Sequence, residues 1–167
     1  MKKKIFGFLA ILMVCFSAVG LLAGCGAPVE KTFYCDEGLT ITLDDSFSET
    51  QTTMTYTLQN RNVVFMAQKD TFDVIAEAGY SHIDTVQEYA QFCATNGGLS
   101  VMIGTNTDYQ YAYFDYTNTA AGQLYHYYAV VVKGSDAFWL CQFACFDSKI
   151  NTYSETFDMW AQTIIVA

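Results

Sequence analysis

Hydrophobic and polar residues alternate along most of the chain after residue 31, as in β-strands that bury one face. Strands are predicted at residues 32–36, 39–43, 51–58, 62–68, 99–104, 108–117, 123–133, 137–146 and 163–166. Short turn-forming segments join most of them, so sequence neighbours should pair antiparallel. Residues 137–146 are apolar on both faces, which predicts a strand that is covered from both sides.

Helices are predicted at three places among these strands. Thr71 can cap a short helix, and Asp84 can open a second one, with Gln87 completing a capping box. Asp147 or Ser148 can cap the last helix. Helices spread along a sheet that is buried on both faces predict an α+β fold, a three-layer α/β/α sandwich around a mainly antiparallel sheet.

The first 24 residues have the layout of a signal peptide. Three lysines at positions 2–4 precede an apolar run over residues 5–22, and two small residues precede Cys25. The segment Leu-Ala-Gly-Cys that ends at Cys25 resembles the lipobox of bacterial lipoproteins, which implies lipid attachment to this cysteine and an extracytoplasmic domain on the cell membrane. An uncleaved transmembrane anchor is the alternative, because the apolar run approaches the length of a spanning helix.

The rest of the chain divides into a short tether and one domain. Residues 25–31 contain the only proline, Pro28, and show no hydrophobic periodicity. Residues 32–167 contain no internal repeat and no second linker, so we expect a single globular domain there.

The mature chain is strongly acidic. Loss of residues 1–24 removes three of the eight basic residues, which leaves five against seventeen acidic ones and a formal charge of −12. Such a surface repels phosphate backbones and anionic lipid headgroups. We therefore expect no nucleic-acid partner, and we assign the membrane contact to the N-terminal lipid.

Four cysteines remain once Cys15 leaves with the signal peptide and Cys25 is lipidated. Outside the cytoplasm these four could form disulfides. Cys141 and Cys145 cannot pair with each other within one strand, because extended chain separates them by roughly 13 Å. Buried free thiols that pack as small hydrophobes are the favoured interpretation. The four candidates are Cys35, Cys93, Cys141 and Cys145.

Tyrosines gather on two consecutive predicted strands. One strand carries Tyr109, Tyr111 and Tyr113, and the next carries Tyr125 and Tyr127. If the register allows, the two rows could form an aromatic platform for a sugar, a peptide or another cell-wall ligand. The favoured alternative is that they cover the sheet beneath a helix or stabilise it as cross-strand pairs.

No arrangement typical of catalysis or of cofactor binding stands out. The two histidines are His82 and His126, and spacing alone pairs neither with a nucleophilic cysteine. The Cys141 and Cys145 pair and the His82 and Asp84 pair each offer too few ligands for a zinc site. Phosphate-binding loops, dinucleotide-binding turns and nucleophile elbows are missing from the sequence. We expect no metal, no cofactor and no catalytic residue.

Several segments resemble PsbP-like bacterial lipoproteins. They are residues 38–43 (GLTITL) before a turn and Phe47, residues 85–90 (TVQEYA), residues 137–140 (AFWL), and the closing helix before residues 163–166 (TIIV). Asp44 stands where this family usually has a proline in the first turn. The resemblance covers nearly the whole mature chain and implies an α/β/α sandwich around an antiparallel sheet, the fold of photosystem extrinsic subunits, which are binding and assembly proteins.

These features together predict a non-catalytic binding or accessory module of the cell envelope, with an envelope ligand or protein as its partner. A cell-envelope hydrolase and an assembly factor of an envelope complex are the alternatives. A water-accessible cleft with an acid or base beside a nucleophile would favour the enzyme.

Overall fold

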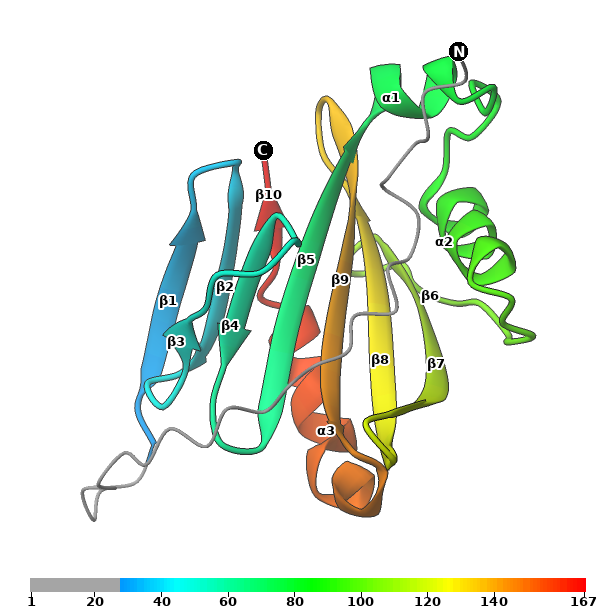
Figure 1. The fold of residues 1–167 in the computed structure, drawn as a ribbon. Coiled ribbons are helices and arrows are strands. Elements are labelled where there is room, and N and C mark those ends of the chain that lie inside the picture. The colour runs from blue at the N-terminus through cyan, green and yellow to red at the C-terminus, as the bar shows by residue number, and fades with distance from the viewer. Residues whose placement is uncertain (1–27) are drawn as a thin grey trace.

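The computed structural model describes residues 28–167, which form two antiparallel sheets with helices packed against them (Figure 1). The predicted signal peptide and Cys25 lie outside the described residues. The strands are β1 (Glu30–Cys35), β2 (Leu39–Asp44), β3 (Ser48–Glu49), β4 (Tyr56–Gln59), β5 (Val63–Thr71), β6 (Gly104–Asn106), β7 (Tyr111–Ala120), β8 (Gln123–Lys133), β9 (Ala137–Phe146) and β10 (Ile165–Val166). The helices are α1 (Phe72–Glu77), α2 (Val86–Asn96), the short 3-10 helix η1 (Asp147–Lys149) and α3 (Ile150–Ala161).

The larger sheet has the strand order β3-β4-β5-β9-β8-β7-β6, with β9 in the middle. β9 pairs antiparallel with β5 on one side and with β8 on the other, so that Phe143 lies opposite both Phe65 and Tyr128. Every residue of β9 except Phe146 is buried. The prediction of a strand covered on both faces is confirmed, and its bounds are the predicted ones.

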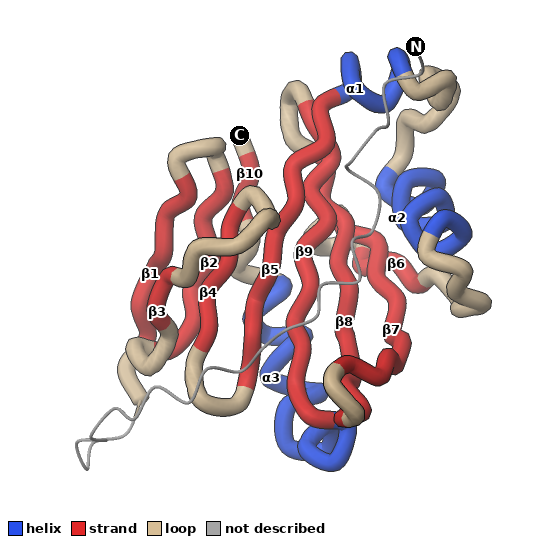
Figure 2. Tube along the Cα trace, viewed as in Figure 1, coloured by secondary structure: helices blue, strands red, loops and turns tan. Residues whose placement is uncertain are grey.

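Helices cover the two faces of the larger sheet separately (Figure 2). On one face, Tyr89 of α2 packs in a core with Phe138. On the other face, Phe157 of α3 packs with Trp139 and Phe143, and the smaller sheet, of order β1-β2-β10, adds apolar residues to this second core. The α+β prediction of a three-layer α/β/α sandwich is confirmed. Within residues 28–167, none of the helices reaches the length and hydrophobicity of a membrane span.

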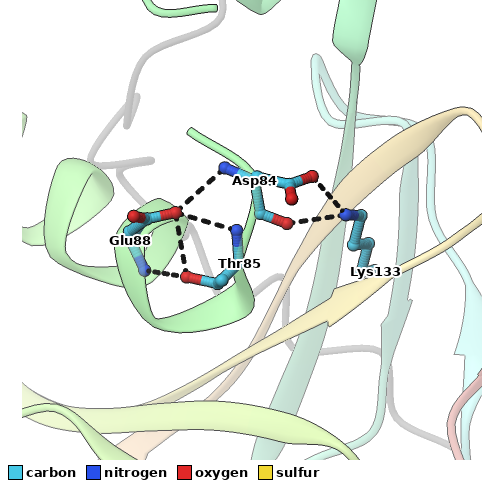
Figure 3. Close-up of polar contacts among 4 residues, drawn as sticks. All are labelled: Asp84, Thr85, Glu88 and Lys133. Carbon is cyan, nitrogen blue, oxygen red and sulfur yellow. Dashed lines mark hydrogen bonds and ion pairs between the residues drawn. The ribbon is translucent and has the colours of Figure 1, made fainter. Parts of the chain in front are cut away.

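The start of α2 is capped one residue later than predicted (Figure 3). The hydroxyl of Thr85 accepts a hydrogen bond from the backbone N–H of Glu88 at 3.2 Å, and Oε2 of Glu88 accepts from the backbone N–H of Thr85 at 3.0 Å. The predicted box of Asp84 with Gln87 is wrong, because the Asp84 carboxylate instead forms an ion pair with Nζ of Lys133 at 2.7 Å. This pair ties the start of α2 to the end of β8.

One predicted strand is replaced by a loop. Residues 99–103 lie outside any strand, and β6 begins only at Gly104. Leu99, Val101 and Ile103 nevertheless alternate inward and pack against the core on the α2 side. Alternation of apolar and polar residues indicates which side chains are buried. Here the alternating segment packs against the core as a loop, without pairing to another strand. The predicted strand at 51–58 is likewise shorter, because β4 begins at Tyr56.

Two element starts differ from the predicted ones. The predicted cap of the last helix at Asp147 or Ser148 is wrong, because η1 leads directly into α3 and no side chain caps either helix. β1 begins at Glu30, so the last residues assigned to the tether pair with β2. Antiparallel pairing with β2 extends the strand beyond the point at which the alternating pattern begins.

Candidate functional site

A pocket of about 520 Å³ opens between α3 and the edge of the larger sheet. Its volume falls in the range of small-ligand sites. α3 contributes Phe157 and Asp158 to the lining, and β7 and β8 contribute Tyr113, Asp115 and Tyr128. α3 lies on the sheet face opposite α2 (Figure 1), so the pocket lies on the face of the sheet that carries the second core. We refer to it as the α3 pocket.

Three neutral donors hold the carboxylate of Asp158. Its Oδ1 accepts hydrogen bonds from the hydroxyls of Tyr111 at 2.8 Å and Tyr128 at 3.3 Å. Its Oδ2 accepts from Nε2 of Gln162 at 2.8 Å, and Nδ2 of Asn106 donates to the Tyr111 hydroxyl at 3.1 Å. Among the described residues, no lysine, arginine or histidine forms an ion pair with this carboxylate.

The tyrosine hydroxyls in this network stay protonated. Burial raises the pKa of Tyr111 and the pKa of Tyr128 above the usual tyrosine value, and contact with Asp158 acts in the same direction. A phenolate beside a carboxylate would be repelled by it, which is why this contact favours the neutral hydroxyl. Both hydroxyls therefore keep the protons that they donate to the Asp158 carboxylate.

Tyr113 forms an aromatic wall of the pocket. Its ring lies 6.2 Å from the ring of Tyr111 and 5.7 Å from the ring of Tyr128, measured between centroids. Gly104 of β6 lies opposite Tyr113 in the register, and a Cβ atom on Gly104 would collide with the Tyr113 ring. The missing side chain at Gly104 lets this ring lie across β6, which sets its place in the pocket.

His126 bridges two carboxylates beside the pocket. Its Nε2 lies 3.0 Å from Oδ1 of Asp115, and its Nδ1 lies 3.6 Å from Oδ1 of Asp147 in η1. The hydrogen bond with Asp115 is the main reason that the pKa of His126 is raised above its usual value. A carboxylate at each nitrogen favours the imidazolium form and leaves no nitrogen to activate a nucleophile. The bridge connects β7 and β8 to the start of α3.

Comparisons with known proteins identify the fold. No family model matches this sequence, and no curated protein matches it. The solution structure of cyanobacterial PsbP (CyanoP) from Synechocystis matches with a TM-score of 0.50 at 10% identity, over 90% of this chain and 100% of that chain. The chain has a PsbP-like fold.

Two further solved structures match this chain. LpqN, which is involved in cell envelope biogenesis of Mycobacterium tuberculosis, has a TM-score of 0.43 at 10% identity, over 85% of this chain and 92% of that chain. The protein of unknown function PA94 from Pseudomonas aeruginosa has a TM-score of 0.45 at 12% identity, over 83% of this chain and 97% of that chain. The family resemblance inferred from the sequence is confirmed at the level of the fold.

The PsbP-like fold does not bring the predicted tyrosines onto one platform. Tyr111 and Tyr113 face the second core, whereas Tyr125 and Tyr127 belong to the core on the α2 side. The register explains this, because it pairs odd positions of β7 with even positions of β8, as in Tyr113 opposite Val130. Residues directly opposite each other share a sheet face, so the two odd-numbered rows point in opposite directions.

The predicted tyrosines and the lining of the α3 pocket overlap in part. Tyr113 lines the α3 pocket, and the Tyr111 hydroxyl donates a hydrogen bond to Asp158 in its lining. Tyr109 lies in the turn before β7 with 52% of its surface exposed. Sequence reasoning missed Asp158 and Tyr128. Apolar residues recur along one face of the last helix in the sequence, but its polar positions carry no signal that shows which strand they meet.

The four candidate cysteines are free thiols in the described residues. Cys93 lies in the core on the α2 side, and Cys35, Cys141 and Cys145 lie in or against the second core. Burial raises all four thiol pKa values, to about 12 for Cys93 and about 11 for Cys145. Protonated thiols are weak nucleophiles, so these side chains act as small hydrophobes. Residues 28–167 contain no cluster of three or more metal-ligating side chains.

Proposed function

We propose that this chain is a lipid-anchored, non-catalytic binding or accessory module of the cell envelope, and that its ligand or partner occupies the α3 pocket. The lipobox-like segment that ends at Cys25 supports the anchor and the extracytoplasmic location. The PsbP-like fold provides the scaffold, but a fold hosts many functions, so the proposal depends on the site. The observation that carries it is a ligand-sized pocket with a carboxylate that three neutral donors hold in place.

The chemistry of the pocket favours binding over catalysis. Asp158 accepts hydrogen bonds on both oxygens, and His126 faces a carboxylate at each nitrogen. A general acid or base must instead lie within hydrogen-bond reach of the reacting proton, and these two side chains contact tyrosine hydroxyls, an amide and carboxylates rather than a candidate nucleophile. Ser154 also lines the pocket, but within the described residues no base is hydrogen-bonded to its hydroxyl. Fixed acceptors beside tyrosine rings are suited to recognition.

The proposal can be tested with soluble fragments of the bacterial envelope, such as muropeptides and released saccharides. We would add them to isotope-labelled protein that has been purified from membranes in detergent. We expect NMR shifts at residues 104–107, 111–115 and 154–158, and we expect mass spectrometry to recover the fragments unchanged. Cleavage of the fragments would favour a hydrolase, and shifts elsewhere or none at all would contradict the proposal.

A matched pair of variants sharpens this test. Ser154→Trp should fill the pocket and abolish the shifts, because Ser154 lies on its lining. Gln91→Trp places the same side chain at an exposed position of α2, on the opposite sheet face, and should leave the shifts in place. Equal behaviour of the two variants would show that the fragments do not use the pocket.

The anchor has its own test. Cys25→Ser should abolish labelling with a fatty-acid probe and release the protein from membranes, because the thiol is the proposed acceptor of lipid. Cys15→Ser removes another thiol of the leader and should change neither result. Continued labelling of Cys25→Ser, or its full retention in the membrane fraction, would contradict lipid attachment at this residue.

A further inference from the structure

We propose that the ligand of the α3 pocket is a small organic cation whose ammonium or guanidinium group binds at Asp158. This inference rests on the proposed function, in which the pocket is a binding site. It is carried by the imbalance of charge in the pocket and by the rings and apolar side chains beside it.

The pocket contains an uncompensated negative charge. Two carboxylates, Asp115 and Asp158, belong to its lining, and the lining includes no lysine or arginine. Asp115 has a counter-charge in His126 at 3.0 Å, whereas the hydrogen-bond donors of Asp158 are all neutral. Neutral donors orient a carboxylate without balancing its charge. A cationic group on the ligand would supply that balance through a charge-assisted hydrogen bond.

The other walls suit the body of such a ligand. Tyr113 is partly exposed and brings an aromatic ring to the pocket, and a cation is attracted to the face of a tyrosine ring. Ile150 is partly exposed and supplies apolar surface for an alkyl chain, whereas Phe157, which also borders the pocket, is fully buried in the core behind it. A charged head with a short apolar body therefore matches the lining better than a fully polar ligand does.

The charge distribution also excludes the opposite class of ligand. An anion would meet Asp115 and Asp158 in the pocket, and it would approach a mature chain with a formal charge of −12. Long-range repulsion lowers the local concentration of anions and raises that of cations. A neutral polyol would be neither attracted nor repelled, so it is the comparison that decides the proposal.

Putrescine and 1,4-butanediol provide that comparison, because they share a four-carbon chain and differ in charge. Titrated into the membrane-purified protein and followed by NMR, putrescine should shift the pocket resonances and bind at least about tenfold more tightly than the diol. Raising the salt concentration should weaken the binding of putrescine and leave the binding of the diol unchanged. Equal affinities for putrescine and the diol would refute the proposal that the ligand is a cation, but the pocket would still be a binding site. If envelope fragments shift the pocket resonances but about 10 mM putrescine does not, the proposal of a cationic ligand is also refuted. If no probe shifts the pocket resonances, the proposed function is refuted as well.

Three variants locate the cation. Asp158→Asn should lower the affinity for putrescine about tenfold. Asp73→Asn removes an exposed charge from α1 and should leave this affinity unchanged. Ser154→Lys places a resident ammonium one helical turn from Asp158 at an exposed position, so it should compete with putrescine without removing any native contact. Folded Asp158→Asn and Ser154→Lys proteins that bind putrescine like the wild type would refute the assignment.

Discussion

Removal of one hydroxyl from the core on the α2 side, by Tyr89→Phe, should destabilise the protein more at neutral pH than at acidic pH. Tyr89 is fully buried, Asp70 is 7% exposed, and the Tyr89 hydroxyl donates a hydrogen bond to Oδ2 of Asp70. The Tyr89 ring stacks on Phe138 at a centroid distance of 4.6 Å. Phenylalanine keeps this stacking, so the substitution removes only the contacts of the hydroxyl, which are the hydrogen bond to Asp70 and an interaction with the Cys93 thiol.

The size of the effect follows from what Asp70 loses. A hydrogen bond to a charged group contributes about 1.5–3 kcal/mol, and a buried acceptor left without a donor keeps its desolvation cost. Gln68 also hydrogen-bonds to Asp70 and satisfies part of the carboxylate. We therefore expect the lower half of this range, about 1.5–2 kcal/mol at neutral pH. In a domain of this size that corresponds to a fall in Tm of roughly 3–8 °C.

The pH dependence has a definite sign. Burial raises the pKa of Asp70, and the Tyr89 hydrogen bond opposes that rise. Tyr89→Phe should therefore raise the folded-state pKa of Asp70 further. A carboxyl group with a raised folded pKa binds more protons when folded, so its contribution to stability falls as pH increases from the unfolded pKa through the folded pKa. The penalty of Tyr89→Phe should be smallest near about pH 4 and should grow toward about pH 8.

Urea unfolding of wild type and Tyr89→Phe across this pH range measures the effect. A double-mutant cycle with Asp70→Asn should give a coupling energy of about 1 kcal/mol or more at neutral pH. Tyr34→Phe removes a hydroxyl from a side chain that is 71% exposed and should change the free energy of unfolding by less than about 0.5 kcal/mol. A Tyr89→Phe penalty that does not vary with pH, together with negligible coupling, would refute the reasoning.

Three further predictions concern the His126 bridge, the cap of α2 and the thiols. The pKa of His126 is raised, so its ion pairs stabilise the fold below the usual histidine pKa and are lost as pH rises through the folded pKa. His126→Gln should lower stability by about 0.5–1 kcal/mol near pH 5.5 and change little near pH 8.5 in thermal melts, and the opposite trend would contradict the bridge. Thr85→Ala should cost about 1 kcal/mol in urea unfolding while Thr85→Ser stays close to wild type; equal losses would contradict capping by the hydroxyl. Thiol titration of denatured, unreduced mature protein should find the four free cysteines of the described residues, and a lower number would show a disulfide.

Sequence alone determined most of the local elements and the two faces of the central strand. The predicted bounds 123–133 and 137–146 are those of β8 and β9, because alternation and turn residues act over a few neighbouring positions. Thr71 caps α1 as predicted for the same reason. Where two local patterns competed, Thr85 caps α2 together with Glu88, while Asp84 forms an ion pair with Lys133 across 49 residues.

Only the tertiary structure decided the candidate site. Asp158 meets Tyr111 and Tyr128 across sequence separations of 47 and 30 residues. The register of β7 against β8 also determines which tyrosines share a face, and a shift of one residue would exchange the rows. A side chain's burial follows from its own periodicity, but its partners depend on how separate elements pack. The charge at Asp158 thus acquires its neutral donors, and the α3 pocket its shape, only once α3 lies against the sheet.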